Sequence, residues 1–213
     1  MKEIYALGVG TATPLFCEIA EEAGYKIAGL YHYKEGRKGE NVNGYEILGS
    51  FDELFSSDIS GKYFLMTMGE MSIKKELTDR IEAKGGIVPT IVHPSAIIYK
   101  SASVSDSGVI IGPGVIVQSN AIINKGVMLR DMALVCHNAV VDEYVFVGPK
   151  ALIGSCIHVS RLVFVGQSST LISKKANEIG ENALIGAGAL VTKDVPANFM
   201  AIGVPAKIVA KNH

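Results

Sequence analysis

A six-residue period of aliphatic side chains runs through the second half of the chain. Eleven successive sixth positions hold Ile, Leu or Val. These positions are Ile111, Val117, Ile123, Leu129, Val135, Val141, Val147, Ile153, Val159, Val165 and Leu171. Four residues after many of them stands a small or β-branched residue, such as Ala121 or Ala133. This six-residue period predicts short strands joined by turns, with three strands to a coil. Residues eighteen positions apart then stack on one another in successive coils.

The same period defines the extent of the repeat. It resumes at Ile179 after eight residues instead of six, which predicts a short loop at SKKANE, and Ile98 and Val104 extend it backwards. Such a unit cannot bury its apolar face alone, so we expect it to associate with copies of itself. The alternative fold is an ordinary β-sandwich, but its strands would alternate with a period of two.

The residues before Pro94 follow a different pattern. Apolar runs at residues 3–9, 25–33, 63–69 and 87–94 predict strands. Thr13 and Pro14 predict the start of a helix that ends at Gly24, and Ser72 predicts the cap of a second helix. Alternating strands and helices imply a small parallel sheet that is open at the carboxyl ends of its strands. We therefore predict an α/β domain at 1–92 and a repeat domain at 93–213.

Charge and composition bear on the classes of partner that the chain can have. Twenty Lys and Arg against 21 Asp and Glu give a net charge of -1, and no run of five like charges occurs, so neither nucleic acid nor an anionic membrane surface is predicted as a partner. No apolar stretch approaches the roughly 18 residues that span a bilayer. The first residues suit a strand better than a secretory signal, which predicts a cytoplasmic location. Three cysteines without C-x-x-C spacing suggest neither disulfides nor a zinc site.

Several segments are similar to a known family. The hexads IGPGVI, VQSNAI, INKGVM, VGPKAL and IGAGAL resemble the repeats of the left-handed β-helix acyltransferases, and VTKDVPANFMAIGVPAKIVAK resembles the closing segment of that superfamily. With its α/β part, the whole chain resembles the bacterial sugar acetyltransferases, which include bacillosamine and perosamine N-acetyltransferases and sialic acid O-acetyltransferase. The resemblance implies transfer of an acetyl group from acetyl-CoA to an amine or hydroxyl of a sugar or nucleotide sugar. It also implies a homotrimer with its site between two β-helices.

The resemblance also assigns a general base. The family's catalytic hexad falls on VCHNAVVDEYVFVGP, which places His137 at the base position. An imidazole can accept the proton that an attacking amine or hydroxyl loses at neutral pH. The acidic residue that follows the base in the family is Asn138 here, and a second family histidine beside the thioester corresponds to Phe146.

The remaining site residues are carried over from the same family. Its contacts to coenzyme A fall on Ser155, Gln167, Ala187 and Lys193, and its nucleotide pocket falls on Gly8, Gly10, Thr11, His32, Tyr33 and Gly69. Thr11 and Thr13 occupy glycine positions of the family's turn, and His32 and Tyr33 replace an acidic pair. These departures predict weaker binding of UDP-sugars than in relatives that keep the acidic pair. Backbone amides near Gly69 and at a helix starting at Ser72 are expected to receive a phosphate.

Two other functions are compatible with a hexapeptide repeat. Metal-dependent carbonic anhydrases with this repeat need three histidines on adjacent coils, whereas the repeat here offers His137 and His158, which are 21 residues apart. No metal site is therefore predicted. A catalytically silent scaffold or nucleotide-sugar-binding subunit would explain why Asn138 and Phe146 replace the family's acidic residue and second histidine. It gives no reason for a histidine, His137, at the family's catalytic position in the repeat. Release of free thiol from acetyl-CoA distinguishes this alternative from an enzyme.

Overall fold

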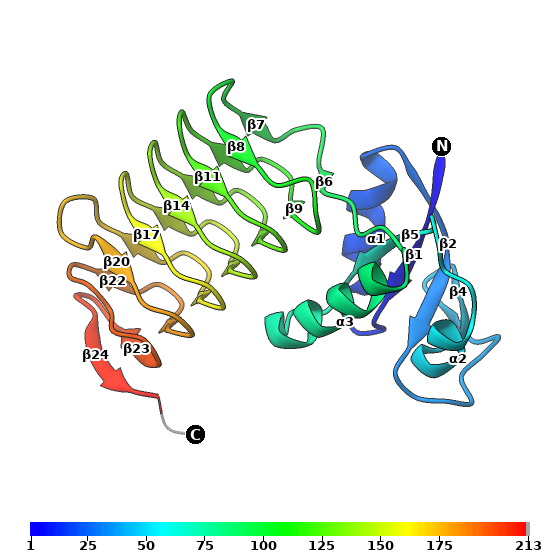
Figure 1. Ribbon diagram of the computed structural model, residues 1–213. Coiled ribbons are helices and arrows are strands. Elements are labelled where there is room, and N and C mark those ends of the chain that lie inside the picture. The colour runs from blue at the N-terminus through cyan, green and yellow to red at the C-terminus, as the bar shows by residue number, and fades with distance from the viewer. Residues whose placement is uncertain (212–213) are drawn as a thin grey trace. The chain divides into compact units, whose positions relative to one another are not determined.

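The computed structural model describes residues 1–211. It divides into two compact units, Met1–Pro94 and Ser95–His213, and each is described separately below (Figure 1). Among the described residues, no helix has the length and apolar character that crossing a membrane requires.

The first unit is a five-stranded sheet with helices packed against it. Its strands are β1 (Lys2–Leu7), β2 (Tyr25–His32), β3 (Asn41–Val42), β4 (Tyr45–Ser50) and β5 (Tyr63–Met66), followed by β6 (Ile91–Val92), and its helices are α1 (Thr13–Glu22), α2 (Phe51–Ser56) and α3 (Met71–Ala83). The sheet order is β3-β4-β2-β1-β5, and all its pairs are parallel except β3 with β4. The strand order reverses beside β1, where β2 lies on one side and β5 on the other. Open α/β sheets bind ligands at such a reversal, outside the carboxyl ends of the strands.

Three ends of elements differ from the sequence-based expectation. Strand β1 ends at Leu7 because Gly8 has φ +100° and leaves the extended conformation. The N-cap of α1 is Ala12, so Thr13 is the first helical residue, and its buried hydroxyl bonds to the preceding turn. The N-cap of α3 is Glu70, and Ser72 lies inside the helix.

Other elements of this unit were not predicted or are shorter than predicted. Asn43 and Gly44 have φ values of 51° and 94°, which allow the tight hairpin between β3 and β4. Helix α2 begins with a capping box, in which the Ser50 hydroxyl accepts from the Glu53 amide and the Glu53 carboxylate accepts from the Ser50 amide. In the run 87–94 only Ile91–Val92 is a strand, because Pro89 has no amide proton for a ladder.

The second unit is a parallel β-helix of short strands in three sheets. The first sheet holds β7 (Ile97–Ile98), β10 (Ile116–Val117), β13 (Leu134–Val135), β16 (Leu152–Ile153), β19 (Thr170–Leu171) and β22 (Leu190–Val191); the second holds β8 (Ser103–Val104), β11 (Ile122–Ile123), β14 (Val140–Val141), β17 (His158–Val159) and β20 (Glu178–Ile179). The third holds β9 (Ile110–Ile111), β12 (Met128–Leu129), β15 (Phe146–Val147), β18 (Phe164–Val165), β21 (Leu184–Ile185), β23 (Phe199–Ile202) and β24 (Lys207–Ala210). Figure 1 shows the coils stacked one on another. Pairs such as Val117 with Val135 and Val147 with Val165 confirm the predicted spacing of eighteen residues.

The core of the β-helix is the predicted column of aliphatic side chains. The eleven positions from Ile111 to Leu171, together with Ile179, Ile185 and Val191, are each at most 1% exposed. Ala121 and Ala133 are fully buried beside them. The loop predicted after Leu171 is confirmed, because β19 ends at that residue and β20 begins only at Glu178. The chain closes with β24 antiparallel to β23.

Many turns of the β-helix contain a residue in the left-handed region. Asn120, Asn138, Cys156 and Lys174 have φ values of 58°, 55°, 61° and 62° and stand at successive eighteenth positions. Asparagine accepts this conformation more readily than most residues with a side chain. The local backbone at Asn138 is therefore dictated by the repeat as well as by its neighbours.

Candidate functional site

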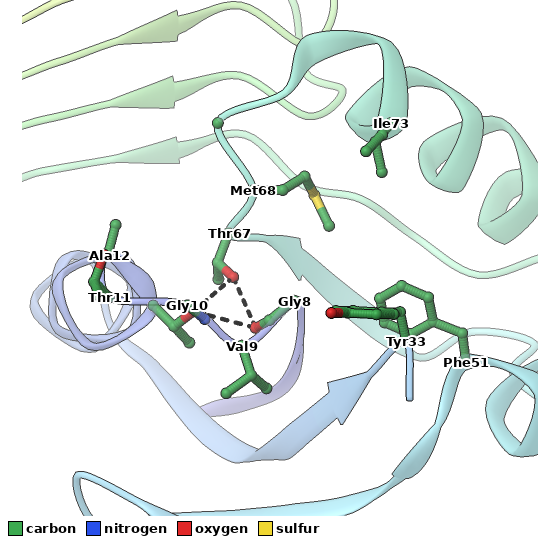
Figure 2. Close-up of a pocket in the computed structure, with 12 residues that line it drawn as sticks. Gly8, Val9, Gly10, Thr11, Ala12, Tyr33, Phe51, Thr67, Met68 and Ile73 are labelled. Atoms are coloured by element: carbon green, nitrogen blue, oxygen red, sulfur yellow. Dashed lines mark hydrogen bonds between the residues drawn. The ribbon is translucent and has the colours of Figure 1, made fainter. Parts of the chain in front are cut away.

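The first unit contains a pocket beside β1, where the strand order reverses. Its volume is about 410 Å³ (Figure 2). The lining residues are Gly8, Val9, Gly10, Thr11, Ala12, Thr13, Tyr33, Phe51, Thr67, Met68, Gly69 and Ile73. Five of the six predicted substrate-binding residues, Gly8, Gly10, Thr11, Tyr33 and Gly69, therefore lie around one cavity. His32 is not part of its lining.

Two threonine hydroxyls hold the turn that follows β1. Thr13 Oγ1 accepts from the Gly10 amide at 2.9 Å and lies 3.1 Å from Thr67 Oγ1, which is 2.9 Å from the Gly8 carbonyl oxygen (Figure 2). A Cβ atom at Gly8 would lie 3.0 Å from Thr67 Oγ1, whereas one at Gly10 would meet nothing within 4 Å. Gly8 is thus needed for the fold of the turn, and Gly10 leaves open space beside the backbone.

The two aromatic residues at the end of β2 have different environments. The Tyr33 ring is 65% exposed and stacks on the His32 ring with a centroid distance of 4.4 Å. His32 is only 3% exposed, and its Nδ1 accepts from the Lys34 amide at 2.9 Å. Burial lowers the pKa of His32, and the positive charge of Arg37 adds to this effect. The buried His32 ring therefore supports Tyr33 by stacking and is not itself part of the pocket lining.

The two helix N-termini of this region are not equivalent toward an anion. The first turn of α1 has no acidic residue, and its positive dipole end follows the Gly8–Thr13 turn. At α3 the N-cap is Glu70, whose carboxylate accepts a hydrogen bond from the Ser72 hydroxyl at 2.9 Å. The expectation of a phosphate at a helix starting at Ser72 is therefore revised, because a carboxylate already stands at that helix end.

His137 lies on the β-helix at the turns that leave the first sheet. We call this line of turns, residues 136–139, 154–157, 172–177 and 192–194, the histidine edge. Asn138 Nδ2 lies 2.9 Å from His137 Nδ1, and the Gln118 side chain accepts from the His137 amide at 3.0 Å. The Asn138 amide can donate to Nδ1 or, after a half-turn, accept from Nδ1–H. Only the second arrangement leaves Nε2 without a proton and able to act as a base.

Two other predicted residues lie along the histidine edge. Leu134 pairs with Leu152, Leu152 with Thr170, and Thr170 with Leu190, so His137, Ser155 and Lys193 follow these strands at equivalent places. The Ser155 hydroxyl donates to Ser173 Oγ at 3.0 Å, and Ser173 Oγ also accepts from the Ser155 amide. Motif reasoning did not identify Gln118 and Ser173. The eighteen-residue spacing could have placed Ser173 beside Ser155, whereas Gln118 stands nineteen residues before His137.

The other predicted coenzyme A residues lie elsewhere on the β-helix. Gln167 and Ala187 belong to the turns that leave the third sheet, residues 148–151, 166–169 and 186–189, which we call the glutamine edge. Glycines bring adjacent coils close here, since a Cβ atom at Gly166 would lie 2.6 Å from the Ala187 amide nitrogen. Phe146 precedes this edge and stacks on Phe164 with a centroid distance of 4.7 Å and an interplanar angle of 5°. One chain therefore does not bring the predicted residues together, but divides them between two edges.

His158, one of the two histidines considered for a metal site, pairs with a carboxylate. His158 lies on β17, and its Nε2 is 2.7 Å from Asp142 Oδ2, while Asp142 Oδ1 accepts from the side-chain Nδ2 of Asn124 at 3.2 Å. Among residues 1–211, no three His, Cys, Asp or Glu side chains form a group that could hold a metal ion. His137 and His158 do not converge on one point.

The fold places the chain in a defined structural class, a left-handed β-helix of hexapeptide repeats preceded by an α/β unit. It is similar to perosamine N-acetyltransferase from Caulobacter crescentus, solved as a mutant with CoA and GDP-perosamine, with a TM-score of 0.89, 22% identity and coverage of 99% of this chain and 98% of that one. It is also similar to the acetyltransferase domain of PglB from Neisseria gonorrhoeae, solved with acetyl coenzyme A, with a TM-score of 0.78, 24% identity and coverage of 98% and 99%. The predicted fold class and the resemblance to sugar acetyltransferases of this fold are confirmed.

Sequence similarity to curated proteins is confined to a short segment. Galactoside O-acetyltransferase of Escherichia coli is 55% identical over 31 residues, which is 15% of this chain and 15% of that protein. The chain thus matches about a sixth of the length of such relatives. No protein-family model matches the chain.

Proposed function

We propose that this protein transfers an acetyl group from acetyl-CoA to an amine or hydroxyl of a sugar or nucleotide sugar. The observation that carries the proposal is His137 on an edge of a hexapeptide β-helix that follows an α/β unit with a pocket at its ligand-binding position. In this proposal residues 1–92 bind the acceptor and residues 93–213 carry out the transfer, in the cytoplasm. The fold shared with acetyltransferases supports the assignment.

The chemistry assigned to His137 is general base catalysis. Acetyl-CoA, when bound, supplies a thioester whose acetyl group passes to the acceptor as CoA leaves. His137 Nε2 takes the proton that the acceptor nitrogen or oxygen loses as it forms the new bond. Asn138 orients the imidazole through Nδ1. Phe146 offers no hydrogen-bond donor, so the thioester oxygen must be stabilised by other groups such as backbone amides.

The residues present suit an extended acyl-CoA ligand. Gln167, Ala187 and Lys193 are exposed, and Ser155 is partly buried. We assign Gln167, Ala187 and the region of Phe146 to the acyl-CoA side of the site, and Ser155 and Lys193 to its continuation along the histidine edge. Lys193 supplies the positive charge for a phosphate.

The division of these residues between two edges favours a homotrimer. Within one β-helix the histidine edge and the glutamine edge leave different sheets, so a site that uses both needs a second copy. We expect light scattering at micromolar concentration to give three times the 22.6 kDa chain mass. A stable monomer at that concentration would contradict this prediction.

The activity is tested by release of free thiol from acetyl-CoA. The acceptors are amino sugars, hydroxyl sugars and their nucleotide-linked forms. Acceptor-dependent thiol release supports the proposal. Its absence with every acceptor favours the alternative function, a silent scaffold or sugar-binding subunit, to which Asn138 and Phe146 also point.

The residue beside the base offers a second test. We expect Asn138→Asp to keep or raise the transfer rate, because a carboxylate accepts only from Nδ1–H and therefore fixes the tautomer with a free Nε2. The added anion also favours imidazolium, so the acidic limb of the pH–rate profile should move to higher pH. Aspartate tolerates the left-handed backbone of this position. A fall in rate at all pH values would contradict the role given to Asn138.

A further inference from the structure

The pocket of the first unit is uncharged. None of its twelve lining residues, which all lie within the described chain, carries a charged side chain. Guanidinium, carboxylate and carboxamide side chains make paired hydrogen bonds to the edge of a base, and this lining has none of them. We therefore expect stacking, shape and apolar contact to dominate recognition of a nucleoside here, with hydroxyls and backbone groups as the only hydrogen-bond partners in the lining.

No acidic side chain lines the pocket near the end of β2, since Glu35, three residues beyond this strand, is not among the lining residues. In nucleotide-binding sheets of this kind, an acidic residue after the second strand hydrogen-bonds the ribose 2′-hydroxyl. This chain has His32 and Tyr33 there, and the His32 ring is buried with its Nδ1 already bonded to the Lys34 amide. A lining without a carboxylate lacks the usual acceptor for a ribose 2′-hydroxyl, so we expect 2′-deoxyribose to be bound as well as ribose.

The pocket does offer a surface for a ring. Tyr33 is exposed, lines the pocket, and is held by the stacked and buried His32. Figure 2 shows the Tyr33 and Phe51 rings at the same side of the cavity. The Lys34 ammonium lies 5.6 Å from the Tyr33 ring centroid, and this lysine is exposed. A base can stack on Tyr33 with little ordering of the protein, because His32 already fixes the tyrosine.

The remaining walls are aliphatic. Val9, Met68 and Ile73 line the pocket together with Phe51. Among common bases, thymine adds a methyl group to the uracil ring, and burial of one such group corresponds to roughly four-fold in affinity. Guanine adds polar edge groups instead, for which the lining provides no charged partner.

We propose that this pocket binds the thymidine part of a thymidine diphosphate sugar and selects it by stacking on Tyr33 and by apolar contact. The inference rests on the proposed function, because it names the nucleotide of the acceptor. The diphosphate would lie toward the N-terminus of α1, where no acidic residue opposes it.

The test is calorimetric titration of the full chain with dTDP, dUDP, 5-methyluridine diphosphate, UDP and GDP. The first four differ only in the base methyl group and the ribose 2′-hydroxyl, so they separate the effects of these two groups on affinity. We expect each methylated nucleotide to bind roughly four-fold more tightly than its unmethylated partner. The 2′-hydroxyl should change affinity less than the methyl group does, because no carboxylate of the lining accepts from it, and GDP should bind more weakly than dTDP. UDP or GDP binding as tightly as dTDP would overturn the inference.

Two variants test the stacking surface. Tyr33→Ala should weaken dTDP binding by roughly 5- to 150-fold, the usual range for removing a base–aromatic stack. Tyr33→Phe keeps the ring and should bind dTDP nearly as well as the wild type. Equal dTDP binding by Tyr33→Ala and wild type would also overturn the inference.

The two proposals fail in different ways. If acetyl transfer to an amino sugar occurs but no thymidine diphosphate binds, the pocket inference is wrong and the enzymatic function stands. If dTDP binds as expected but no acceptor, including dTDP-sugars, releases thiol from acetyl-CoA, the pocket inference stands and the enzymatic function is wrong.

Discussion

Replacing His137 with alanine is expected to lower the rate of acetyl transfer by about 100- to 10,000-fold, the usual cost of losing a general base. The acceptor would then lose its proton to water instead of to an imidazole beside the thioester. Affinity for acetyl-CoA should change little, because Nε2 is assigned to the proton of the acceptor. The measurement is thiol release under saturating acetyl-CoA, with the dissociation constant of acetyl-CoA determined separately.

His158→Ala is the matched control for this variant. His158 is also a histidine of the β-helix, but it lies on the second sheet and pairs with Asp142. Its loss should leave the transfer rate near that of the wild type. Equal activity of His137→Ala and wild type would remove the assigned base, and a similar loss in both variants would indicate a general effect on the fold.

Replacing Val147 with aspartate should prevent the β-helix from folding. Val147 is 0% exposed and stacks between Leu129 and Val165 in the aliphatic column, where a carboxylate would have neither water nor a partner. An uncompensated buried charge costs several kcal/mol, which is comparable with the total stability of many domains. Loss of the β-sheet signal in circular dichroism, together with insolubility on expression, would be the observed result.

Ser103→Asp provides the corresponding surface control. Ser103 occupies the outward position of a two-residue strand and is exposed, so its carboxylate would remain in water. This variant should unfold at nearly the wild-type temperature. A stable, soluble Val147→Asp protein would contradict the packing of the column.

The two units differ in how far their structures could be predicted from the sequence. In the β-helix each coil repeats one pattern, so the inward positions from Ile111 to Leu171 follow from the period alone. In the α/β unit, strand β4 and helix α2 escaped prediction, although Asn43-Gly44 and the Ser50–Glu53 capping box are recognisable signals. Thr13 has the sequence of a helix cap, but its hydroxyl bonds the Gly8 turn because Thr67, 54 residues away, completes that cluster.

Which residues belong to the candidate site could be predicted better than how their side chains are placed. Sequence resemblance selected Gly8, Gly10, Thr11, Tyr33 and Gly69, which surround one pocket. It could not foresee that His32 would be buried, because burial depends on how distant elements pack. The separation of His137 from Gln167 was implicit in the repeat, because the 30 residues between them are not a multiple of eighteen and therefore place them on different edges of the β-helix.

The left-handed backbone at Asn138 restricts which residues can stand beside His137. Glycine, asparagine and aspartate accept this conformation with least strain, whereas β-branched residues are strongly disfavoured. Asparagine and aspartate codons differ by a single base. The charge next to the imidazole can therefore be exchanged in one mutational step without reshaping the turn, so that natural selection could tune or silence this position while the scaffold stays unchanged.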